Sequence, residues 1–188
     1  MTSRNVPIAI CIVALAMMVG SVALTGRETV PRRLAALMSL PPLPNSLAEL
    51  ASLRTISDAP PYSIDVISAS PGGANVVRFH ARPVDAITIR GNQSLTLNGW
   101  AYDGRSSEPA RAMMLEIDRH DLIAITYGDA RPDVGTFFRA ATLTNVGFDA
   151  SIPADRFGRG RHRIDLIVIS ADGSSYYRVV DRIMCYRT

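Results

Sequence analysis

Residues 95–102 read LTLNGWAY, and their pattern indicates the fold class. Apolar Leu95 and Leu97 alternate with polar neighbours, which is the period of two of a strand that has one buried face. The same alternation recurs in residues 64–67, 76–80, 86–90, 112–118, 122–127, 147–152, 164–170 and 176–184. Turn residues separate these segments, for example Pro-Gly-Gly at 71–73 and Asp-Gly at 103–104 and 172–173. Many short strands joined by turns predict a mostly β chain that folds as an Ig-like antiparallel β-sandwich over residues 62–188.

A long apolar run precedes this region. Residues 6–26 read VPIAICIVALAMMVGSVALTG and carry no charge. A helix of roughly 20 apolar residues crosses the hydrocarbon core of a bilayer. The run is also longer than the apolar part of a signal peptide, which is about 7–15 residues. We therefore expect a short N-terminal tail at 1–5 and a transmembrane helix in membrane lipid at 6–26, with a cleaved signal peptide as the alternative.

Residues 27–61 are expected to form a juxtamembrane helical linker, or stalk. Ser46 and Glu49 have the spacing of a capping box, in which each side chain binds a free backbone N–H group at a helix start. Leucines follow at helical spacing, at Leu47, Leu50 and Leu53. The apolar side of this helix needs a cover, which is either its own domain or a partner protein or membrane surface.

Charge and cysteine content exclude some classes of protein. All 20 basic residues are arginine and the net charge is +3, without a long basic run. A nucleic-acid-binding surface needs a clustered basic patch, so no nucleic-acid partner is predicted. Cys11 lies in the apolar run and Cys185 near the other end, so no internal disulfide is expected.

The usual catalytic and metal-binding motifs are absent from the sequence. No G-x-S-x-G segment occurs, and the histidines at 80, 120 and 162 do not have the spacing of zinc ligands. Acidic residues are scattered, mostly at turns. We therefore predict no catalytic residue, no metal site, no cofactor and no enzymatic activity. An enzyme would require an unexpected convergence of residues such as Arg131, Asp133 and His162.

One short basic cluster lies in the segment RFGRGRHRID, at residues 156–165. Arginine guanidinium groups match the geometry of phosphate and carboxylate. The cluster is either a solvated loop that leads into a strand or a site for an anionic glycan or lipid headgroup. Its candidate residues are Arg156, Arg159, Arg161 and Arg163.

Trp100 and Tyr102 are the aromatic candidates for ligand binding. Exposed Trp and Tyr rings often stack on sugars, which makes them candidates for glycan binding. Sandwich domains also commonly bury one Trp on a central strand. The second interpretation, burial of Trp100, is the preferred one.

Residues 127–138, YGDARPDVGTFF, contain an Arg and an Asp on either side of a proline. Pro132 favours the first turn of a helix, and Asp133 can accept the free N–H groups there. We expect a short helical turn that buries Phe137 or Phe138, with Arg131 paired to a carboxylate such as Asp133 or Asp149. This interpretation makes the segment a structural corner and not a catalytic pair.

Four segments occur in a characteristic order: GWAYD at 99–103, YGDARPDV at 127–134, GFDASIP at 147–153 and GRHRIDL at 160–166. Their order and spacing resemble an extracytoplasmic Ig-like β-sandwich domain of bacterial envelope proteins. That domain often follows the multi-span part of glycosyltransferase-like membrane proteins of the lipid-linked sugar class. The resemblance covers about residues 95–177, and it implies a domain without established catalytic residues.

The resemblance also implies a location. Arginines flank the apolar run on both sides, so the charge bias does not set the orientation. From the resemblance we expect a single-pass protein of the bacterial inner (cytoplasmic) membrane with a periplasmic C-terminal domain. Because the chain has no transferase portion, its expected role is that of an accessory or scaffolding subunit that docks on an integral-membrane protein complex. The alternatives are an envelope-glycan-binding or glycan-assembly module and an enzyme of unknown class.

Overall fold

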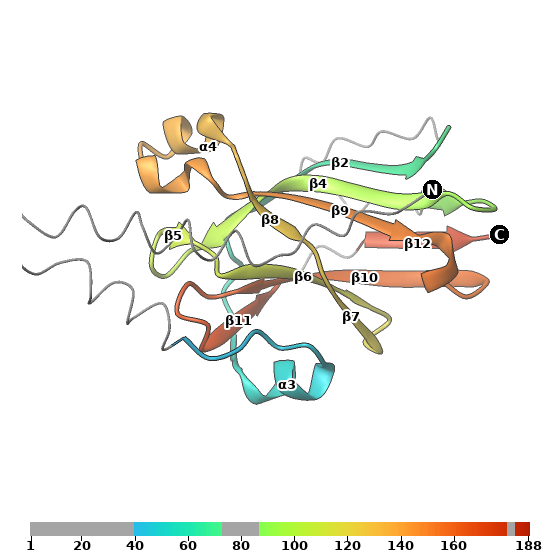
Figure 1. Cartoon of the computed structure of the whole chain (residues 1–188), viewed down its shortest axis with the longest axis horizontal. Coiled ribbons are helices and arrows are strands. Elements are labelled where there is room, and N and C mark those ends of the chain that lie inside the picture. Colours follow the sequence, from blue (N-terminus) through green and yellow to red (C-terminus); the bar gives the residue numbers. More distant parts are fainter. Residues whose placement is uncertain (1–39, 73–86, 180–182) are drawn as a thin grey trace, which may run out of the picture. The chain divides into compact units, whose positions relative to one another are not determined.

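The computed structural model of the chain describes residues 40–72, 87–179 and 183–188. The predicted membrane helix at 6–26 and the predicted strand at 76–80 lie outside the described residues. Among the residues that are described, no helix is long and apolar enough to cross a membrane. Residues 41–188 form one compact unit, which holds both sheets (Figure 1).

The chain is mostly β, and its strands form two sheets that pack face to face as a β-sandwich. The first sheet, sheet A, contains β1 (Arg54–Ile56), β3 (Ile87–Ile89), β6 (Ala112–Ile117), β7 (Asp121–Ala124), β10 (Gly160–Ile169), β11 (Ser175–Arg178) and β12 (Ile183–Arg187). The second, sheet B, contains β2 (Tyr62–Ser70), β4 (Ser94–Asp103), β5 (Glu108–Pro109), β8 (Thr126–Asp129) and β9 (Gly147–Pro153). The helical elements are α3 (Leu47–Ser52), α4 (Pro132–Phe137), η1 (Ala141–Thr144) and η2 (Ala154–Arg156).

Strand β10 is the centre of sheet A. It pairs with β6 along one edge and with β11 and β12 along the other. Strand β7 extends the sheet beyond β6, while β1 and β3 extend it beyond β11 and β12. Sheet B has the order β2-β4-β9-β8, and β5 pairs with the end of β4.

Two pairings differ from the purely antiparallel sandwich that the sequence predicts. Strand β1 is parallel to β11, and β3 is parallel to β12. Parallel neighbours require a long connection instead of a hairpin. Both β1 and β3 are three-residue edge strands that come from distant parts of the chain. Local alternation does not reveal the direction of such a strand.

The main core lies between the two sheets. Side chains from sheet B, including Leu95, Leu97 and Phe148, meet side chains from sheet A, including Leu115 and Leu166, in one buried cluster. All five are at most 2% exposed. Burial of this much apolar surface is the main force that holds the two layers together.

Strand β10 is buried on both faces from Ile164 to Ile169. Its residues Ile164, Leu166 and Val168 belong to the main core. Ile167 and Ile169 belong to a second cluster on the outer face of sheet A. Helix α3 covers the outer face of this strand, which explains why its apolar residues are nearly continuous.

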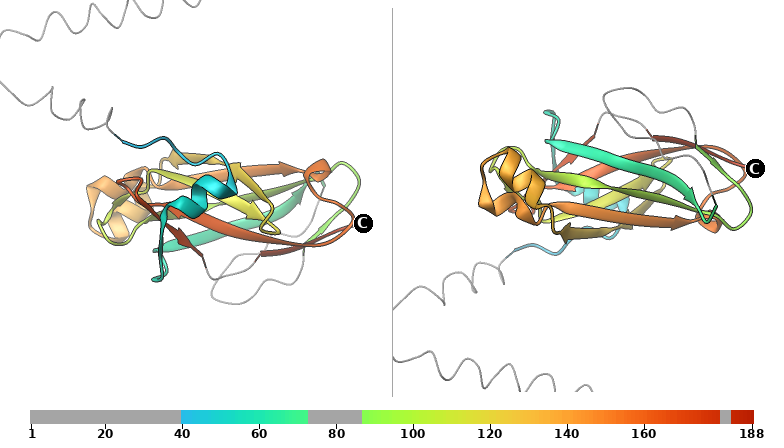
Figure 2. Two further views of the ribbon diagram at one scale, coloured as in Figure 1. Left: turned by 90° about the horizontal axis from the view of Figure 1, so that it is seen from below. Right: turned by 90° about the horizontal axis from the view of Figure 1, so that it is seen from above.

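Helix α3 packs on sheet A. Leu50 is 1% exposed and joins Met114, Ile167, Ile169 and Tyr176 in the second cluster, with Leu47 and Leu53 partly buried beside it. Figure 2 shows α3 against one layer, with β2, β4 and β9 of the other layer visible from the opposite side. Of the two covers considered for the three leucines, the structure shows the chain's own domain.

The predicted capping box of α3 is present with one change. The Ser46 hydroxyl accepts a hydrogen bond from the Glu49 backbone N–H at 3.3 Å. The Glu49 carboxylate reaches back to the N–H of Asn45 at 2.8 Å, one residue before the cap.

The predicted strand at 122–127 crosses from one sheet to the other. Its first part, β7, pairs with β6 in sheet A, and its second part, β8, pairs with β9 in sheet B. Ile125 lies at the crossing, where its N–H donates to the carbonyl of Met113 (Figure 1). Strands that switch sheets in this way form the corners of sandwiches.

Candidate functional site

Three of the four quoted sequence segments meet at one end of sheet B. Trp100 on β4 lies opposite Gly147 on β9, and Asp129 on β8 lies opposite the same glycine. Gly99 has no room for a side chain, because an added Cβ would lie 2.0 Å from the carbonyl oxygen of Ser63. The glycine therefore allows β2 and β4 to approach each other just before Trp100.

Arg131 fixes the corner that follows β8. Its guanidinium donates to both carboxylate oxygens of Asp133, from Nε at 2.9 Å and from Nη2 at 2.7 Å. Nη1 donates to Asp65 on β2 at 2.7 Å. The hydrogen bonds from Arg131 hold the pKa of the Asp133 carboxyl below its ordinary value. The predicted pairing with Asp133 is confirmed, whereas the ion pair to Asp149 does not form and Asp65 takes that place.

Helix α4 starts at Pro132, as the sequence predicts. The residue at its N-cap, Arg131, makes no side-chain capping hydrogen bond. The Asp133 carboxylate binds Arg131, and backbone N–H groups of the first turn also contribute to its lowered pKa. The inward face of the helix is formed by Val134, which packs with Leu143 and Val146. Gly135 is also buried, since an added Cβ would lie 2.7 Å from a methyl group of Thr144.

The prediction that Phe137 or Phe138 is buried is wrong. Phe137 is 80% exposed and Phe138 is 37% exposed. The small interior under α4 is already filled by Val134 and its neighbours, so the two phenylalanines at the end of the helix face outward.

The two phenylalanines join Trp100 and Tyr102 in a connected set of rings, which we call the aromatic surface. The ring centroids lie 4.9 Å apart for Phe137 and Phe138, and 5.6 Å apart for Phe138 and Trp100. Phe138 also lies edge-on to Tyr102, at 5.2 Å. Trp100 and Tyr102 are stacked, at 6.1 Å with 15° between their planes. These spacings are those of favourable aromatic pairs.

The two predicted aromatic candidates are thus brought together but are unequally accessible. Tyr102 is 7% exposed and lies in a small core with Val134, while Trp100 is only partly buried against it. Trp100 therefore falls between the two states that the sequence analysis considered.

Tyr127 forms hydrogen bonds next to the part of β4 that carries the aromatic surface. Its hydroxyl donates to the carbonyl of Ala101 at 2.9 Å and accepts from the N–H of Ala110 at 2.9 Å. Burial raises the pKa of Tyr127 to about 12. Tyr127 therefore connects the end of β4 to the segment before β6.

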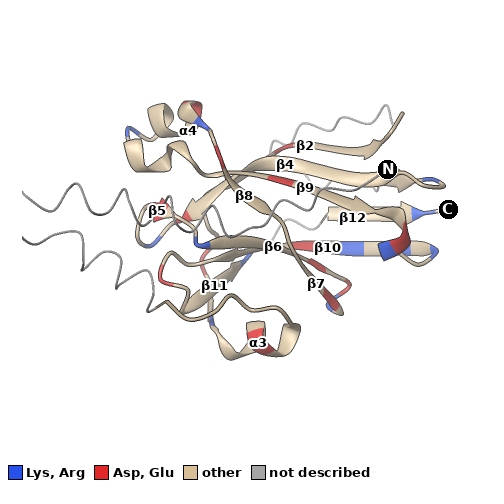
Figure 3. Ribbon diagram, viewed as in Figure 1, with Lys and Arg blue, Asp and Glu red and all other residues tan. Residues whose placement is uncertain are grey.

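The predicted basic cluster does not form a single site. Arg156 pairs with Asp121 on β7, and Arg163 pairs with the buried Asp165 at 2.7 Å. Arg159 and Arg161 are exposed, and no partner for their side chains occurs in the described ranges. Figure 3 shows these basic residues around the start of β10, at the end of the sandwich away from α4.

The residues that would have to converge in an enzyme lie in separate networks. His162 Nδ1 contacts Asp118 Oδ2 at 2.6 Å, and Nε2 contacts the carbonyl of Gly158 at 2.7 Å. Arg131 binds both Asp133 and Asp65, and within the described residues none of the three contacts His162. Within the described part of the chain, no group of three His, Cys, Asp or Glu residues has the arrangement of a metal site.

The sequence analysis did not predict a network of charged residues on the outer face of sheet A. Asp165 and Glu116 are 1% and 3% exposed, and Arg178 bridges their carboxylates. The alternation of β10 assigns Asp165 to the outer face, but nothing local indicates that this face is covered. Buried acids of this kind require charged partners, which explains Arg163 and Arg178.

The segment GFDASIP coincides with β9, GWAYD with the end of β4, and GRHRIDL with the start of β10. The quoted motifs are therefore largely strand residues, with Gly99 and Arg131 in structural roles. No protein-family model and no curated protein matches this chain.

Proposed function

We propose that this chain is a non-enzymatic accessory subunit, anchored in the membrane by residues 6–26, whose Ig-like sandwich docks on a larger integral-membrane protein complex. The aromatic surface is the proposed docking site. In this proposal the anchor lies in a bacterial inner membrane and the sandwich lies on the periplasmic side. The predicted anchor and the resemblance to envelope domains support this location.

The observation that carries the proposal is the exposure of Phe137. A phenylalanine side chain contributes about 1.5–3 kcal/mol when it moves from water into an apolar contact. Here one ring is 80% exposed and adjoins a second that is 37% exposed, at the tip of α4. Two adjacent exposed rings are unfavourable in water. A partner surface that buries both rings would explain why they lie there.

The support around the rings favours a preformed docking site. Arg131 ties α4 to β2, and Pro132 fixes the start of the helix. Phe138 rests against Trp100 and Tyr102 and is thereby held in place. A surface that is already ordered loses little conformational entropy when it binds, which increases affinity.

A protein surface suits these rings better than a sugar does. Phenylalanine has no polar atom to bind the hydroxyl groups of a glycan. Trp100 has its ring stacked on Tyr102 and edge-on to Phe138, so less of its face is free. The glycan-binding alternative therefore rests on Trp100 alone and is the second candidate.

The test replaces Phe137 with a photo-reactive phenylalanine analogue in the full-length chain in its native membranes. We expect one discrete cross-linked product after illumination, at the mass of one partner protein. The same analogue at Tyr186, which is 47% exposed and lies on β12, is the matched control and is expected to give none.

Native mass spectrometry after mild detergent extraction provides the second measurement. The unmodified chain is expected to leave the membrane with a partner at a simple ratio, and Phe137→Ser is expected to weaken that association. A chain that leaves alone, and gives no cross-link from position 137, would exclude the docking role. Binding of the chain to a glycan array, with loss of that binding in Trp100→Phe, would then favour the glycan-binding function.

A further inference from the structure

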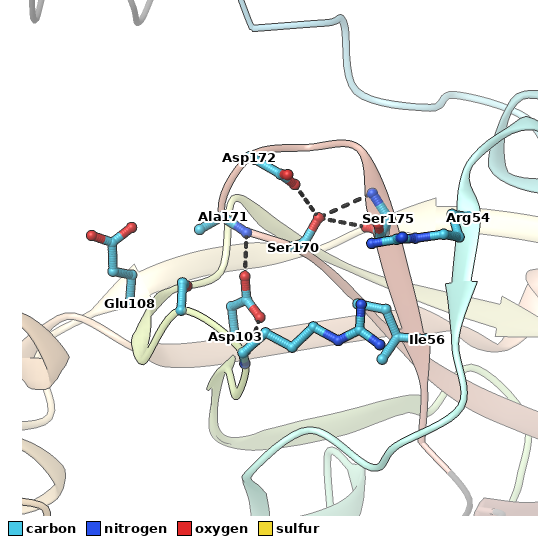
Figure 4. A pocket seen from close by; sticks show the side chains of 10 residues that line it. Arg54, Ile56, Asp103, Glu108, Ser170, Ala171, Asp172 and Ser175 are labelled. Carbon is cyan, nitrogen blue, oxygen red and sulfur yellow. Dashed lines mark hydrogen bonds between the residues drawn. The ribbon is translucent and has the colours of Figure 1, made fainter.

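A pocket of about 340 Å³ lies at the junction of the two sheets, on residues that the docking proposal does not use. It is bounded by β1, by the turn after β4 and by the hairpin at 170–175 between β10 and β11 (Figure 4). Its size lies in the range of small-molecule sites, at the lower end. The pocket can take a small molecule or one terminal group of a larger one.

The floor of the pocket is a fixed hydrogen-bond network around Asp103. One carboxylate oxygen accepts from the hydroxyl of Tyr177 and from the N–H of Arg105, and the other accepts from the N–H of Ala171 at 3.0 Å. Asp103 is 4% exposed. Burial raises the pKa of Asp103, but these hydrogen bonds outweigh it and leave the pKa below its ordinary value. The carboxylate is thus occupied by the protein itself.

In the hairpin on the other side of the pocket, Asp172 is also hydrogen-bonded within the fold. The Ser170 hydroxyl contacts Asp172 Oδ1 at 2.6 Å, and the backbone N–H of Ser174 donates to the same oxygen at 2.9 Å. The Ser174 hydroxyl donates to Asp172 Oδ2 at 2.8 Å. Like Asp103, Asp172 has its oxygens satisfied within the fold, as Figure 4 shows for the Ser170 contact.

The arginines at this pocket differ from these two acids in their hydrogen bonding. Arg54 and Arg105 both line it and are exposed, and within the described residues neither guanidinium has a hydrogen bond or a short ion pair. The hydrogen bond from Ser170 lowers the pKa of the Asp172 carboxyl most, and the charge of Arg54 contributes to the same shift. Their backbones are fixed, since the N–H of Arg54 donates to Ser174 and that of Arg105 to Asp103. Unlike the exposed Arg159 and Arg161, these two cationic side chains line one pocket, and neither guanidinium is hydrogen-bonded to another described residue.

A third guanidinium lies under the same hairpin. An added Cβ at Gly173 would be 2.5 Å from Arg111 Nη1, so the glycine rests directly on this side chain. Arg111 Nη1 is buried and has no hydrogen-bond partner in the described part of the chain. A buried donor without a partner is uncommon in folded proteins and calls for an explanation.

We infer that this pocket binds a small oxyanion-bearing ligand, with a carboxylate or phosphate group held between the guanidinium groups of Arg54 and Arg105. Planar guanidinium groups bind such oxyanions through paired hydrogen bonds. Among the acids of the lining, Glu108 alone has a side chain without a hydrogen bond to another described residue, and it favours a ligand that also carries hydroxyl or amino groups. This ligand site is independent of the docking proposal.

The test is calorimetric titration of the full-length chain in detergent micelles, with inorganic phosphate and with glucuronate as probes at constant ionic strength. We expect at least one probe to bind with millimolar or tighter affinity. Arg54→Gln and Arg105→Gln should each weaken that binding about tenfold, which corresponds to about 1.4 kcal/mol. Binding of phosphate alone identifies a phosphate site, and binding of glucuronate alone identifies a carboxylate site.

Arg161→Gln is the matched control, because it removes the same charge from an exposed arginine on β10 outside this pocket. It should leave the affinity unchanged. An equal loss in this control would show that the net charge and not the pocket attracts the probe, and would overturn the inference. So would the absence of binding by both probes. Because both pocket arginines are exposed and neither guanidinium has a hydrogen bond within the described residues, both variants should nearly keep the thermal stability of the parent chain. Arg105→Gln is the cleaner variant, since Arg54 also attracts Asp172 electrostatically.

Discussion

Arg131 and Asp65 are 66 residues apart in the sequence and form an ion pair of 2.7 Å between Nη1 and Oδ2. The pair joins the corner before α4 to β2 at the opposite edge of sheet B. Because the same guanidinium also binds Asp133, one side chain connects the first turn of α4 to the sheet. The orientation of Phe137 and Phe138 depends on the position of α4.

Replacement of this arginine should destabilise the domain. The Arg131 side chain is 22% exposed, so its three charge-assisted hydrogen bonds are partly shielded from water. We expect Arg131→Gln to lower the free energy of unfolding by about 1–3 kcal/mol. Urea denaturation of the full-length chain in detergent measures this change.

The matched control is Arg156→Gln. The ion pair of Arg156 with Asp121 has side chains 46% and 44% exposed, and such pairs contribute less than about 1 kcal/mol. Equal losses in the two variants would contradict the role assigned to the Arg131 corner.

A second prediction concerns the close approach of β2 and β4. Gly99→Ala places a Cβ 2.0 Å from the Ser63 carbonyl and 2.9 Å from the Phe148 ring, so β2 must shift. We expect a loss of roughly 2–3 kcal/mol in the free energy of unfolding. Gly158→Ala is the control, because the nearest atom to its added Cβ is 3.9 Å away. Thermal melts that show similar stability for both variants would refute the steric argument.

The alternation of Leu95 and Leu97 was enough to predict a strand, and the sum of such strands predicted the layered β architecture. Alternation does not show which strands pair with one another. The three residues of β1 alternate too briefly to be recognised, and their parallel pairing with β11 depends on contacts with a distant segment. The crossing at Ile125 was missed for a similar reason, because the apolar pattern runs through it without a break.

The sequence predicted part of the candidate site. Trp100 and Tyr102 were selected because they are aromatic residues on one strand, and the structure brings Phe138 to them. The outward direction of Phe137 was missed, because it depends on how little space remains under α4 once Val134 is buried. The free state of Arg54 and Arg105 was also not visible in the sequence. It becomes apparent only in the structure, where backbone and hydroxyl donors form the hydrogen bonds of Asp103 and Asp172.

A third prediction uses the titration of Tyr127. Burial raises its pKa to about 12, compared with about 10 for a tyrosine in the unfolded chain. A group whose folded pKa is raised stabilises the fold fully below the unfolded pKa and loses that contribution as the pH rises through the folded pKa. Stability should therefore fall between about pH 10 and pH 12. In Tyr127→Phe, the free energy of unfolding should decline less steeply over that range, although it starts lower because two hydrogen bonds are lost. A slope identical to that of the parent chain would exclude Tyr127 as a contributor to the alkaline transition.

The fourth prediction separates the two roles considered for the leucines of α3. Leu50 is 1% exposed against the outer face of sheet A, so truncation to alanine leaves a cavity in that cluster. We expect Leu50→Ala to reduce the free energy of unfolding by about 2–4 kcal/mol, measured by urea denaturation.

Ala48→Ser is the control for Leu50→Ala, since Ala48 is exposed on the same helix and the change costs less than about 1 kcal/mol in helix propensity. If Leu50 instead served a partner, Leu50→Ala would leave the stability of the isolated chain unchanged and reduce the amount of partner that leaves the membrane with it. The opposite pattern, with lost stability and an intact complex, is the one that burial of Leu50 requires. The two measurements together therefore distinguish a helix that completes its own domain from one that joins the domain to something else.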